Sequence, residues 1–474
     1  MLSAARMSRA SRDDSMENLS SLSFEEAPLI RTEIPGPKSR ELMEKQNAFE
    51  TGSRTYTRQF RIAVRRGRGS TIEDMDGNVF IDWFAGVCVM NLGHSHPVVQ
   101  KAMVRQLEEI THINEMPTES RISFLETLNS TLPQGLKNSA RTMFTVTGGD
   151  ACEAAVSLAR HVTGNRTIVA FGGAYHGVAG DIVRATANYH YRQYAGIALQ
   201  DVYHLPYPYS YRFPVKVREE EMSSFIVSHL EHLLRDPYAG PGPVAGVLVE
   251  PVQGEGGYVV PPSDFLPMLR EVTEKYHVPL ILDEVQSGVG RTGRIWASEH
   301  TGVSPDIMCI SKSIGGGIPV SAIVYREDYD RNLPGGFHLG TYRGNPVALA
   351  AGNAILGYLR NSDVLERVNV LGRKLKSRFE EIARRYDEVG EVRGIGFMVA
   401  TEMVSDRKSR EPGTAIASKL KEQMFSRGVL MHTCGHYSNV MRFMAPLTIE
   451  ERLIDKGADI YAEALDSVTK DTKH

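Results

Sequence analysis

Short apolar runs alternate with longer amphipathic stretches from about residue 140 onward. The runs are "TMFTVTGG", "TIVAFGGAYHG", "VAGVLVEPVQG", "VPLILDEVQSG" and "DIMCISKSIGGG", and segments long enough for a crossover helix separate four of the five. This alternation predicts an α/β fold, a mostly parallel sheet with helices on both faces. Each run ends in glycines mixed with polar residues, and such sheets bind ligands at the carboxyl ends of their strands.

The pattern changes beyond residue 345. "VLERVNVLGRKLKSRFEEIARRYDEV" predicts one long amphipathic helix, and "GEVRGIGFMVATEM" and "NVMRFMAPLTI" predict strands of a smaller α+β unit. The first thirty or so residues hold seven serines and almost no periodic apolar pattern, which predicts a disordered tail. The predicted division is a tail over 1–33, an N-terminal segment of the small domain over 34–84, a large domain over 85–344 and a C-terminal small domain over 345–474.

The overall charge is close to neutral. Lys and Arg total 54 against 57 Asp and Glu, which gives a formal charge of −3 over 474 residues. We therefore expect neither nucleic acid nor a membrane as a partner. Cys88, Cys152, Cys309 and Cys434 lie far apart in the sequence, which favours a reducing cytoplasm over a disulfide framework.

Two glycine-rich loops are candidates for binding an anion. In "TGGDACEAAVSLARHV" a strand runs into a helix, so the N–H groups of Gly148 and Gly149 would face an anion such as phosphate at the helix N-terminus. An ordinary glycine turn fits this loop equally well. "GVGRTG" at 288–293 has dinucleotide spacing, but the residues after it do not begin a helix, which disfavours a nicotinamide or flavin enzyme.

An acid and an amine end two of the predicted strands. Asp283 follows the apolar run "VPLIL", and Lys312 follows "DIMCIS" and precedes three glycines. An ionised carboxylate at a buried strand end needs a positive partner. Pyridoxal phosphate would use all three features, because its aldehyde binds a lysine as a Schiff base, its ring nitrogen wants a carboxylate and its phosphate wants a helix N-terminus.

Six motifs stand out along the chain: "DMDGNVFIDWFAGVCVMNLGHSHP", "GGAYHG", "EPVQGEGG", "LDEVQSGVGRTG", "SKSIGGGIP" and "GTYRGNP". Together they resemble the motifs of the class III aminotransferases of the pyridoxal-phosphate fold type I superfamily. The resemblance extends from residue 35 to the C-terminal helix. It implies a fold with a mostly parallel central sheet, plus a smaller α+β domain built from the N- and C-terminal segments.

The resemblance also implies roles for residues around the cofactor. Lys312 corresponds to the Schiff-base lysine and proton carrier, and Asp283 to the partner of the ring nitrogen. Gln286 is similar to the side chain that hydrogen bonds the phenolic oxygen of the ring. Tyr175 matches the aromatic residue stacked on the cofactor, with His176 beside it shaping the turn.

Further positions of the family pattern concern the phosphate and the substrate. Gly148 and Gly149 match the phosphate loop, and Thr341 matches a threonine that reaches the phosphate of a neighbouring subunit. This implies a homodimer with shared active sites, with higher assembly left open. Arg442 matches an arginine that binds a substrate carboxylate, and Glu250 matches a glutamate that pairs with this arginine when the substrate offers no carboxylate.

The expected reaction transfers an amino group from an ω-amino or diamino acid, of the diaminobutyrate, ornithine or 4-aminobutyrate type, to a 2-oxo acid such as 2-oxoglutarate. Val178 stands where many 4-aminobutyrate and ornithine enzymes have an arginine that grips a distal carboxylate, so 4-aminobutyrate as donor or 2-oxoglutarate as acceptor fits less well. An amino-acid racemase or epimerase of the same family is the alternative. We expect no metal site, since the histidines and cysteine of "HTCGH" and the histidines of "GHSHP" lack a second ligand cluster.

Overall fold

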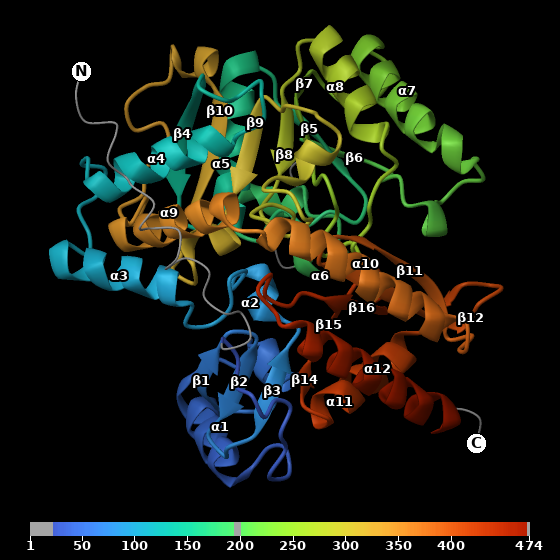
Figure 1. The fold of residues 1–474 in the computed structure, drawn as a ribbon. Helices are drawn as coiled ribbons and strands as arrows, with labels where there is room; N and C mark the ends of the chain where they lie inside the picture. Colours follow the sequence, from blue (N-terminus) through green and yellow to red (C-terminus); the bar gives the residue numbers. More distant parts are fainter. Residues whose placement is uncertain (1–21, 194–200, 472–474) are drawn as a thin grey trace.

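A seven-stranded sheet forms the centre of the large part of the molecule (Figure 1). The computed structural model describes residues 22–193 and 201–471. In spatial order the strands are β4 (Ala140–Thr145), β10 (Ser321–Arg326), β9 (Ile307–Ile310), β8 (Leu280–Asp283), β7 (Val244–Val249), β5 (Thr167–Phe171) and β6 (Val202–Leu205). The last five are parallel to one another, which confirms the mostly parallel sheet, whereas β10 runs antiparallel to both β4 and β9. The sequence patterns did not predict β10.

The apolar runs form central strands because both of their faces are covered. Val247 and Leu282 pack in a cluster with α7 (Met222–Arg235) and α8 (Phe265–Lys275), which lie side by side on one face. Leu248 and Ile281 point the opposite way, to α5 (Gly148–Thr163). Successive residues of a strand face opposite sides, so a strand covered on both faces is apolar throughout.

A second helical layer covers β9 and β10. Met308, Ile310 and Val324 belong to one buried cluster with residues of α4 (Glu119–Thr131) and α9 (Pro346–Asn361). The helix α3 (Pro97–Glu109) packs against α9. Asn345 caps α9, because its side-chain oxygen accepts hydrogen bonds from the N–H groups of Val347 and Ala348, and proline follows at the first helical position.

The N- and C-terminal segments meet in a four-stranded sheet. Its order is β1 (Val64–Arg68), β2 (Thr71–Asp74), β3 (Val79–Asp82) and β14 (Val429–Leu430). The pair β3 and β14 is parallel, with Ile81 opposite Val429. Segments nearly 350 residues apart (429 minus 81 is 348) therefore share one sheet, at the lower side of Figure 1. The predicted boundaries at 34, 85 and 345 stay predictions.

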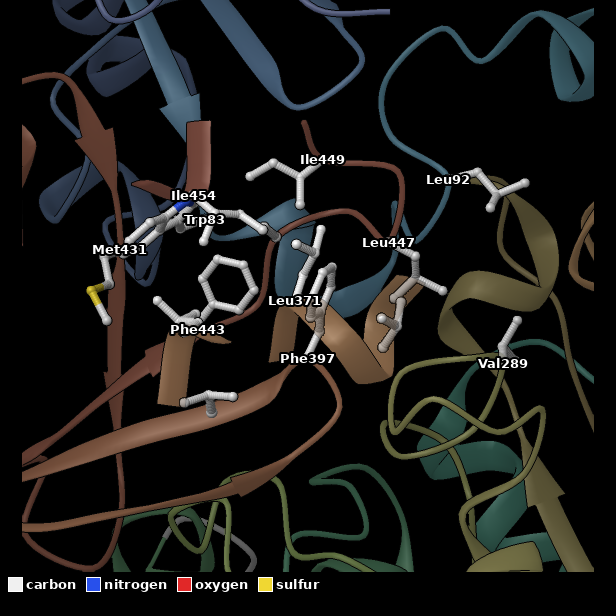
Figure 2. Packing of buried hydrophobic residues seen from close by; sticks show 14 of the residues in the cluster. Trp83, Leu92, Val289, Leu371, Phe397, Met431, Phe443, Leu447, Ile449 and Ile454 are labelled. Carbon is white, nitrogen blue, oxygen red and sulfur yellow. The ribbon is translucent and has the colours of Figure 1, made fainter. Parts of the chain in front are cut away.

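A third sheet follows toward the C-terminus. It contains β11 (Val389–Ile395), β12 (Met398–Asp406), β16 (Val440–Phe443) and β15 (His432–Cys434), and β13 (Glu411–Pro412) pairs with β12. The helices α10 (Val364–Ala383), α11 (Thr414–Ser426) and α12 (Glu451–Asp471) pack on this region. Figure 2 shows its core, in which Phe443 lies between Trp83 and Phe397, with ring centroids 4.9 Å and 5.2 Å away. Since Trp83 directly follows β3, this core joins the two smaller sheets.

Three helices lie outside these layers, namely α1 (Pro37–Phe49), α2 (Ala85–Cys88) and α6 (Tyr189–Arg192). The helix α1 rests on the surface, since Ser39 is its one buried residue. Among the helices of the described residues, none is both long enough and apolar enough to cross a membrane.

The prediction of a disordered tail over 1–33 is wrong for residues 22–33. Phe24 and Ala27 are buried in the main apolar cluster, and Leu29 exchanges two backbone hydrogen bonds with Val79 of β3, at 2.7 and 2.8 Å. The Ser23 N–H donates to Glu450. These few apolar residues are enough to fix the segment, which holds only one of the seven serines on which the prediction rested. The rest of the predicted tail, residues 1–21, lies outside the described residues.

Candidate active site

A cavity of about 280 Å³ opens at the carboxyl ends of β8 and β9. It is lined by residues from five separate stretches of the chain: Thr147, Gly148, Gly149, Tyr175, His176, Gly177, Val178, Ala179, Glu250, Glu255, Asp283, Val285, Gln286 and Lys312. Eight residues that the sequence singled out therefore lie around one space. The two others, Arg442 and Thr341, do not line it.

Asp283 is the last residue of β8, and its carboxylate is almost completely buried. Its Oδ2 lies 2.7 Å from His176 Nδ1 and 3.3 Å from Cys152 Sγ, and its Oδ1 accepts the N–H of Val285 at 3.0 Å. Burial alone would raise the pKa of Asp283, but these hydrogen bonds hold it below its usual value. The carboxylate is therefore ionised and can hold a positive charge in the cavity.

Lys312 begins a short 3₁₀ turn, Lys312–Gly315, directly after β9. Its backbone is left-handed, with φ of 50°, which is rare for a residue with a long side chain. Gly316 and Gly317 also have positive φ, at 59° and 102°, and so continue the tight path after the lysine. Strained backbone of this kind clusters at functional sites, and here it turns the amine into the cavity lining.

The N-terminus of α5 forms one wall of the cavity. The Thr147 side chain caps the helix by accepting the N–H of Asp150, so the N–H groups of Gly148 and Gly149 are left at the lining. A Cβ on Gly148 would lie 2.8 Å from Val285, and one on Gly149 would lie 3.4 Å from Gly177 Cα. Glycine at both positions thus keeps the backbone open to an anion at the positive end of the helix dipole.

The side chains of Gln286 and Tyr175 also line the cavity, one with an amide and the other with an aromatic ring. The Gln286 side-chain oxygen is buried and has no hydrogen-bond partner within the described residues, while its amide nitrogen lies 3.4 Å from Glu255. The Tyr175 ring packs edge to face against Tyr191, at 5.3 Å between centroids. Burial raises the pKa of Tyr175 to about 12, so its hydroxyl stays protonated near neutral pH.

This set of groups fits pyridoxal phosphate. An ionised carboxylate, an amine and a glycine-lined helix N-terminus line one cavity, and Gln286 keeps an unpaired polar atom there. These are the partners that a cationic ring nitrogen, an aldehyde, a phosphate and a phenolic oxygen require. The ligand atoms of Cys152, His176 and Asp283 lie within 4.8 Å of one another, but the direct hydrogen bond from His176 to Asp283 fills the space that a shared metal ion would need.

The expected pairing of Glu250 with Arg442 is wrong. Arg442 of β16 binds Glu255 in two contacts, 2.5 Å from Nη1 to Oε1 and 3.2 Å from Nη2 to Oε2. Glu250 instead accepts the N–H groups of Tyr175 and Gly254, at 3.0 and 2.8 Å. The turn after Glu250 reverses the chain, so it is the second glutamate of "EPVQGEGG" that reaches the arginine.

A second cavity of about 710 Å³ shares Tyr175 and Glu255 with the first. Its wall includes Tyr191 and also His432 of β15. Tyr191 and His432 were not predicted as site residues, and neither was Glu255. Glu255 lies in a motif typical of the family, and His432 lies in "HTCGH", which was considered only as a metal-binding pattern, whereas Tyr191 comes from a stretch without a distinctive pattern.

Thr341 lies on the surface of the chain, away from both cavities. Its carbonyl oxygen lies 3.5 Å from the Asn114 amide nitrogen, which ties its loop to the segment before α4. Exposed Leu339 and Tyr342 flank it. A single chain therefore gives Thr341 no contact with its own cofactor cavity.

The chain is similar to known proteins over most of its length. The family model described as aminotransferase class-III matches residues 52–465. The diaminobutyrate–2-oxoglutarate aminotransferase of Rhizobium meliloti is 36% identical over 433 residues, covering 90% of this chain and 92% of that protein. The 4-aminobutyrate aminotransferase of Mycobacterium bovis is 34% identical over 452 residues, covering 94% of this chain and 99% of that protein.

Solved structures agree with this result. An (S)-enantioselective ω-transaminase from Thermomicrobium roseum superposes with a TM-score of 0.82 at 29% identity, covering 91% of this chain and 98% of that one. An amine transaminase from an uncultivated Pseudomonas species, in its PLP-bound form, gives a TM-score of 0.78 at 31% identity, covering 89% and 97%. The chain therefore belongs to the class III aminotransferases and is a transaminase of fold type I that uses pyridoxal phosphate.

Proposed function

We propose that the protein transfers an amino group from an ω-amino or diamino acid to a 2-oxo acid such as 2-oxoglutarate. The observation that carries this proposal is the two-contact pair of Arg442 with Glu255, where Glu255 lines the same cavity as Lys312. The names of the Rhizobium meliloti and Mycobacterium bovis relatives, which act on diaminobutyrate and 4-aminobutyrate, support this class of donor.

The cofactor is held by four groups of contacts in this proposal. The N–H groups of Gly148 and Gly149 bind the phosphate, and Asp283 binds the ring N–H with His176 behind it. Gln286 hydrogen bonds the phenolic oxygen, and the Tyr175 ring lies against the face of the cofactor. Bound pyridoxal phosphate supplies an aldehyde that combines with amino groups and a cationic ring that accepts electrons from the substrate carbon.

Lys312 moves the proton. Its amine would remove a proton from the substrate carbon that carries the amino group. It would then deliver this proton to the carbon of the bound cofactor that carried the aldehyde oxygen. Asp283 stabilises the ring in its protonated form throughout, since its own pKa is held low. The two residues therefore divide the work between proton transfer and charge stabilisation.

Arg442 and Glu255 select the substrate. The guanidinium of Arg442 binds the 1-carboxylate of a 2-oxo acid in two contacts, in the geometry that arginine favours. An ω-amino donor has no carboxylate beside its reacting carbon, and Glu255 then neutralises the arginine. Glu255 thus takes the role that the sequence resemblance assigned to Glu250.

The assembly is a homodimer with shared active sites in this proposal. Exposed Thr341 contacts the phosphate bound by a second copy of the chain, and its neighbours Leu339 and Tyr342, 75% and 69% exposed, become covered.

The proposed location is the cytoplasm. The four cysteines are buried free thiols, as expected in a reducing compartment; they are Cys88, Cys152, Cys309 and Cys434.

A donor panel tests the function. The purified holoenzyme is incubated with diaminobutyrate, ornithine, 4-aminobutyrate or single L-amino acids, with and without 2-oxoglutarate, and glutamate and D-isomers are measured. Glutamate formed from an ω-amino or diamino acid, absent in Lys312→Ala, supports the proposal. Formation of a D-amino acid without any oxo acid would establish the racemase instead, and turnover by Lys312→Ala at the native rate would contradict both.

A further inference from the structure

We propose that Cys152 is a positioning residue that orients Asp283 toward the cofactor ring, with Cys309 as the second member of a thiol pair behind the carboxylate. The proposal rests on the proposed contact between Asp283 and the ring nitrogen. Neither Cys152 nor Cys309 takes part in the proposed proton transfer.

The thiol of Cys152 contacts the carboxylate directly. Its sulfur lies 3.3 Å from Asp283 Oδ2, within the range of a hydrogen bond to sulfur. Cys309 stands on β9 opposite Asp283 in the parallel register of β8 and β9, and it is hydrogen bonded to Cys152. All three residues are buried, with 0% exposure for both cysteines and 4% for Asp283. The contact is therefore enclosed by protein on the side of α5.

The number of protons fixes the direction of the bond between Cys152 and Asp283. A thiol has one proton, and an ionised carboxylate can only accept. The Cys152 proton therefore goes to Asp283. The hydrogen bond with Cys309, burial and the charge of Asp283 all raise the pKa of the Cys152 thiol, so it remains a donor at neutral pH.

The donors divide unevenly between the two carboxylate oxygens. Within residues 22–193 and 201–471, Oδ2 accepts hydrogen bonds from His176 Nδ1, at 2.7 Å, and from the Cys152 thiol, whereas Oδ1 accepts one from the N–H of Val285 alone. Oδ1 therefore keeps the larger acceptor capacity, and we assign the ring N–H to it. Without the thiol, His176 alone would hold Oδ2, and the carboxylate could rotate about its Cβ–Cγ bond.

The position of Cys152 on α5 gives this contact a further effect. Gly148 and Gly149 begin the same helix, one turn before Cys152. One rigid element thus carries both the phosphate cradle and a donor to the acid beneath the ring nitrogen. This arrangement fixes the spacing between the two ends of the cofactor, which is the preorganisation that a catalytic site needs.

The test uses Cys152→Val, which removes the donor at similar volume, and Cys152→Ser, which keeps a donor. Two readouts do not depend on turnover: the affinity of the apoprotein for pyridoxal phosphate, and the pH titration of the visible absorption band of the holoenzyme. We expect Cys152→Val to weaken cofactor binding and lower kcat by about three- to tenfold, the range for loss of one ordinary hydrogen bond because a thiol is a weak donor, with KM unchanged. Its absorption titration shifts, and Cys152→Ser recovers most of the native behaviour.

Two controls separate positioning from packing. Val156→Ala removes buried volume from the same helix without touching Asp283, so it lowers stability but leaves both readouts unchanged. Cys309→Ala produces a smaller shift of the same sign as Cys152→Val. If Cys152→Val does not fold, Cys152→Ala gives the same comparison with a smaller side chain.

Three results would overturn the proposal. The first is a Cys152→Val holoenzyme with native cofactor affinity and native absorption titration. The second is an equal defect in Cys152→Val and Cys152→Ser, which would mean that volume matters and the donor does not. The third is stoichiometric zinc in the native protein that is lost in Cys152→Val, which would assign Cys152 and its neighbours to a metal. Failure of the native protein to take up pyridoxal phosphate at all would instead contradict the proposed function.

Discussion

Glu250 and Glu255 lie five positions apart in one turn, and both line the active-site cavity. Their carboxylates differ in charge. Burial raises the pKa of Glu250 to about 7, and the nearby negative charge of Asp283 acts in the same direction, while its hydrogen bonds from two backbone N–H groups lower the pKa too little to offset this. Burial would raise the pKa of Glu255 as well, but Arg442 holds it below its usual value.

The comparison shows that burial does not by itself decide the charge of a carboxyl group. A guanidinium in two-contact geometry offsets the cost of desolvation, whereas two backbone amides do not. One turn of the chain therefore supplies both a fixed anion and a group that titrates near neutral pH. The fixed anion, Glu255, pairs with Arg442, and the titrating group, Glu250, accepts the backbone N–H of Tyr175.

Removing the arginine should have the largest effect. We expect Arg442→Ala to lower kcat/KM for 2-oxoglutarate by roughly a hundredfold or more, because two charge-assisted hydrogen bonds to the substrate are lost. It should also reduce the free energy of unfolding by about 2–3 kcal/mol, since Glu255 is left without its partner. The figure is below that of a fully enclosed pair because the Glu255 side chain is 24% exposed. Steady-state kinetics and urea denaturation measure the two effects.

The double variant Arg442→Ala/Glu255→Ala serves as the control for that experiment. It should recover most of the stability, because no unpaired carboxylate remains, but none of the activity with 2-oxoglutarate. A single variant that keeps native kcat/KM for the oxo acid would contradict the assignment of Arg442.

Glu255→Gln should act on one half of the reaction. The neutral amide no longer balances Arg442 when an ω-amino donor is bound, so we expect KM for this donor to rise by about tenfold, the equivalent of about 1.4 kcal/mol. The half-reaction with 2-oxoglutarate should change little, since the oxo acid itself pairs with Arg442. Single-turnover measurements of each half separate the two, and an equal loss in both halves would argue against the switch.

Glu250→Gln should change the pH dependence of stability. The native pKa of about 7 lies above the ordinary value of 4.5, so the folded state holds one more proton than the unfolded state between these values. The free energy of unfolding should therefore fall as the pH rises from about 5 to 7, by up to about 1.4 kcal/mol per unit for this one group. The variant should show a flatter curve in urea denaturation at several pH values. A curve identical to that of the native protein would mean that Glu250 is ionised throughout.

The smallest effect should come from an exposed pair. Arg61 and Glu422 lie 3.0 Å apart, but their side chains are 46% and 66% exposed. We expect Glu422→Gln to change the free energy of unfolding by less than about 0.5 kcal/mol, because solvent screens such pairs. A larger loss would show that partner charge matters as much at the surface as it does at Glu255.

Much of the fold follows from sequence patterns, because apolar runs with glycine-rich ends predict buried parallel strands. The strand β10 could not be found in this way, since its antiparallel position between β4 and β9 is set by tertiary pairing. Asp283 and Lys312 were identified because each ends a buried strand in a distinctive motif. Glu255 was missed because the spacing within "EPVQGEGG" does not tell which carboxylate will face Arg442 after the turn.

The segment around Leu29 has a practical consequence for anyone who shortens this chain. A truncation at residue 34, which the serine-rich composition invites, would leave the amide and carbonyl of Val79 without the partners they have in Leu29. It would also uncover the apolar surface beneath Phe24 and Ala27. A shortened chain should therefore begin no later than residue 22, so that this stretch keeps its backbone pairing with β3 and its packing in the apolar cluster.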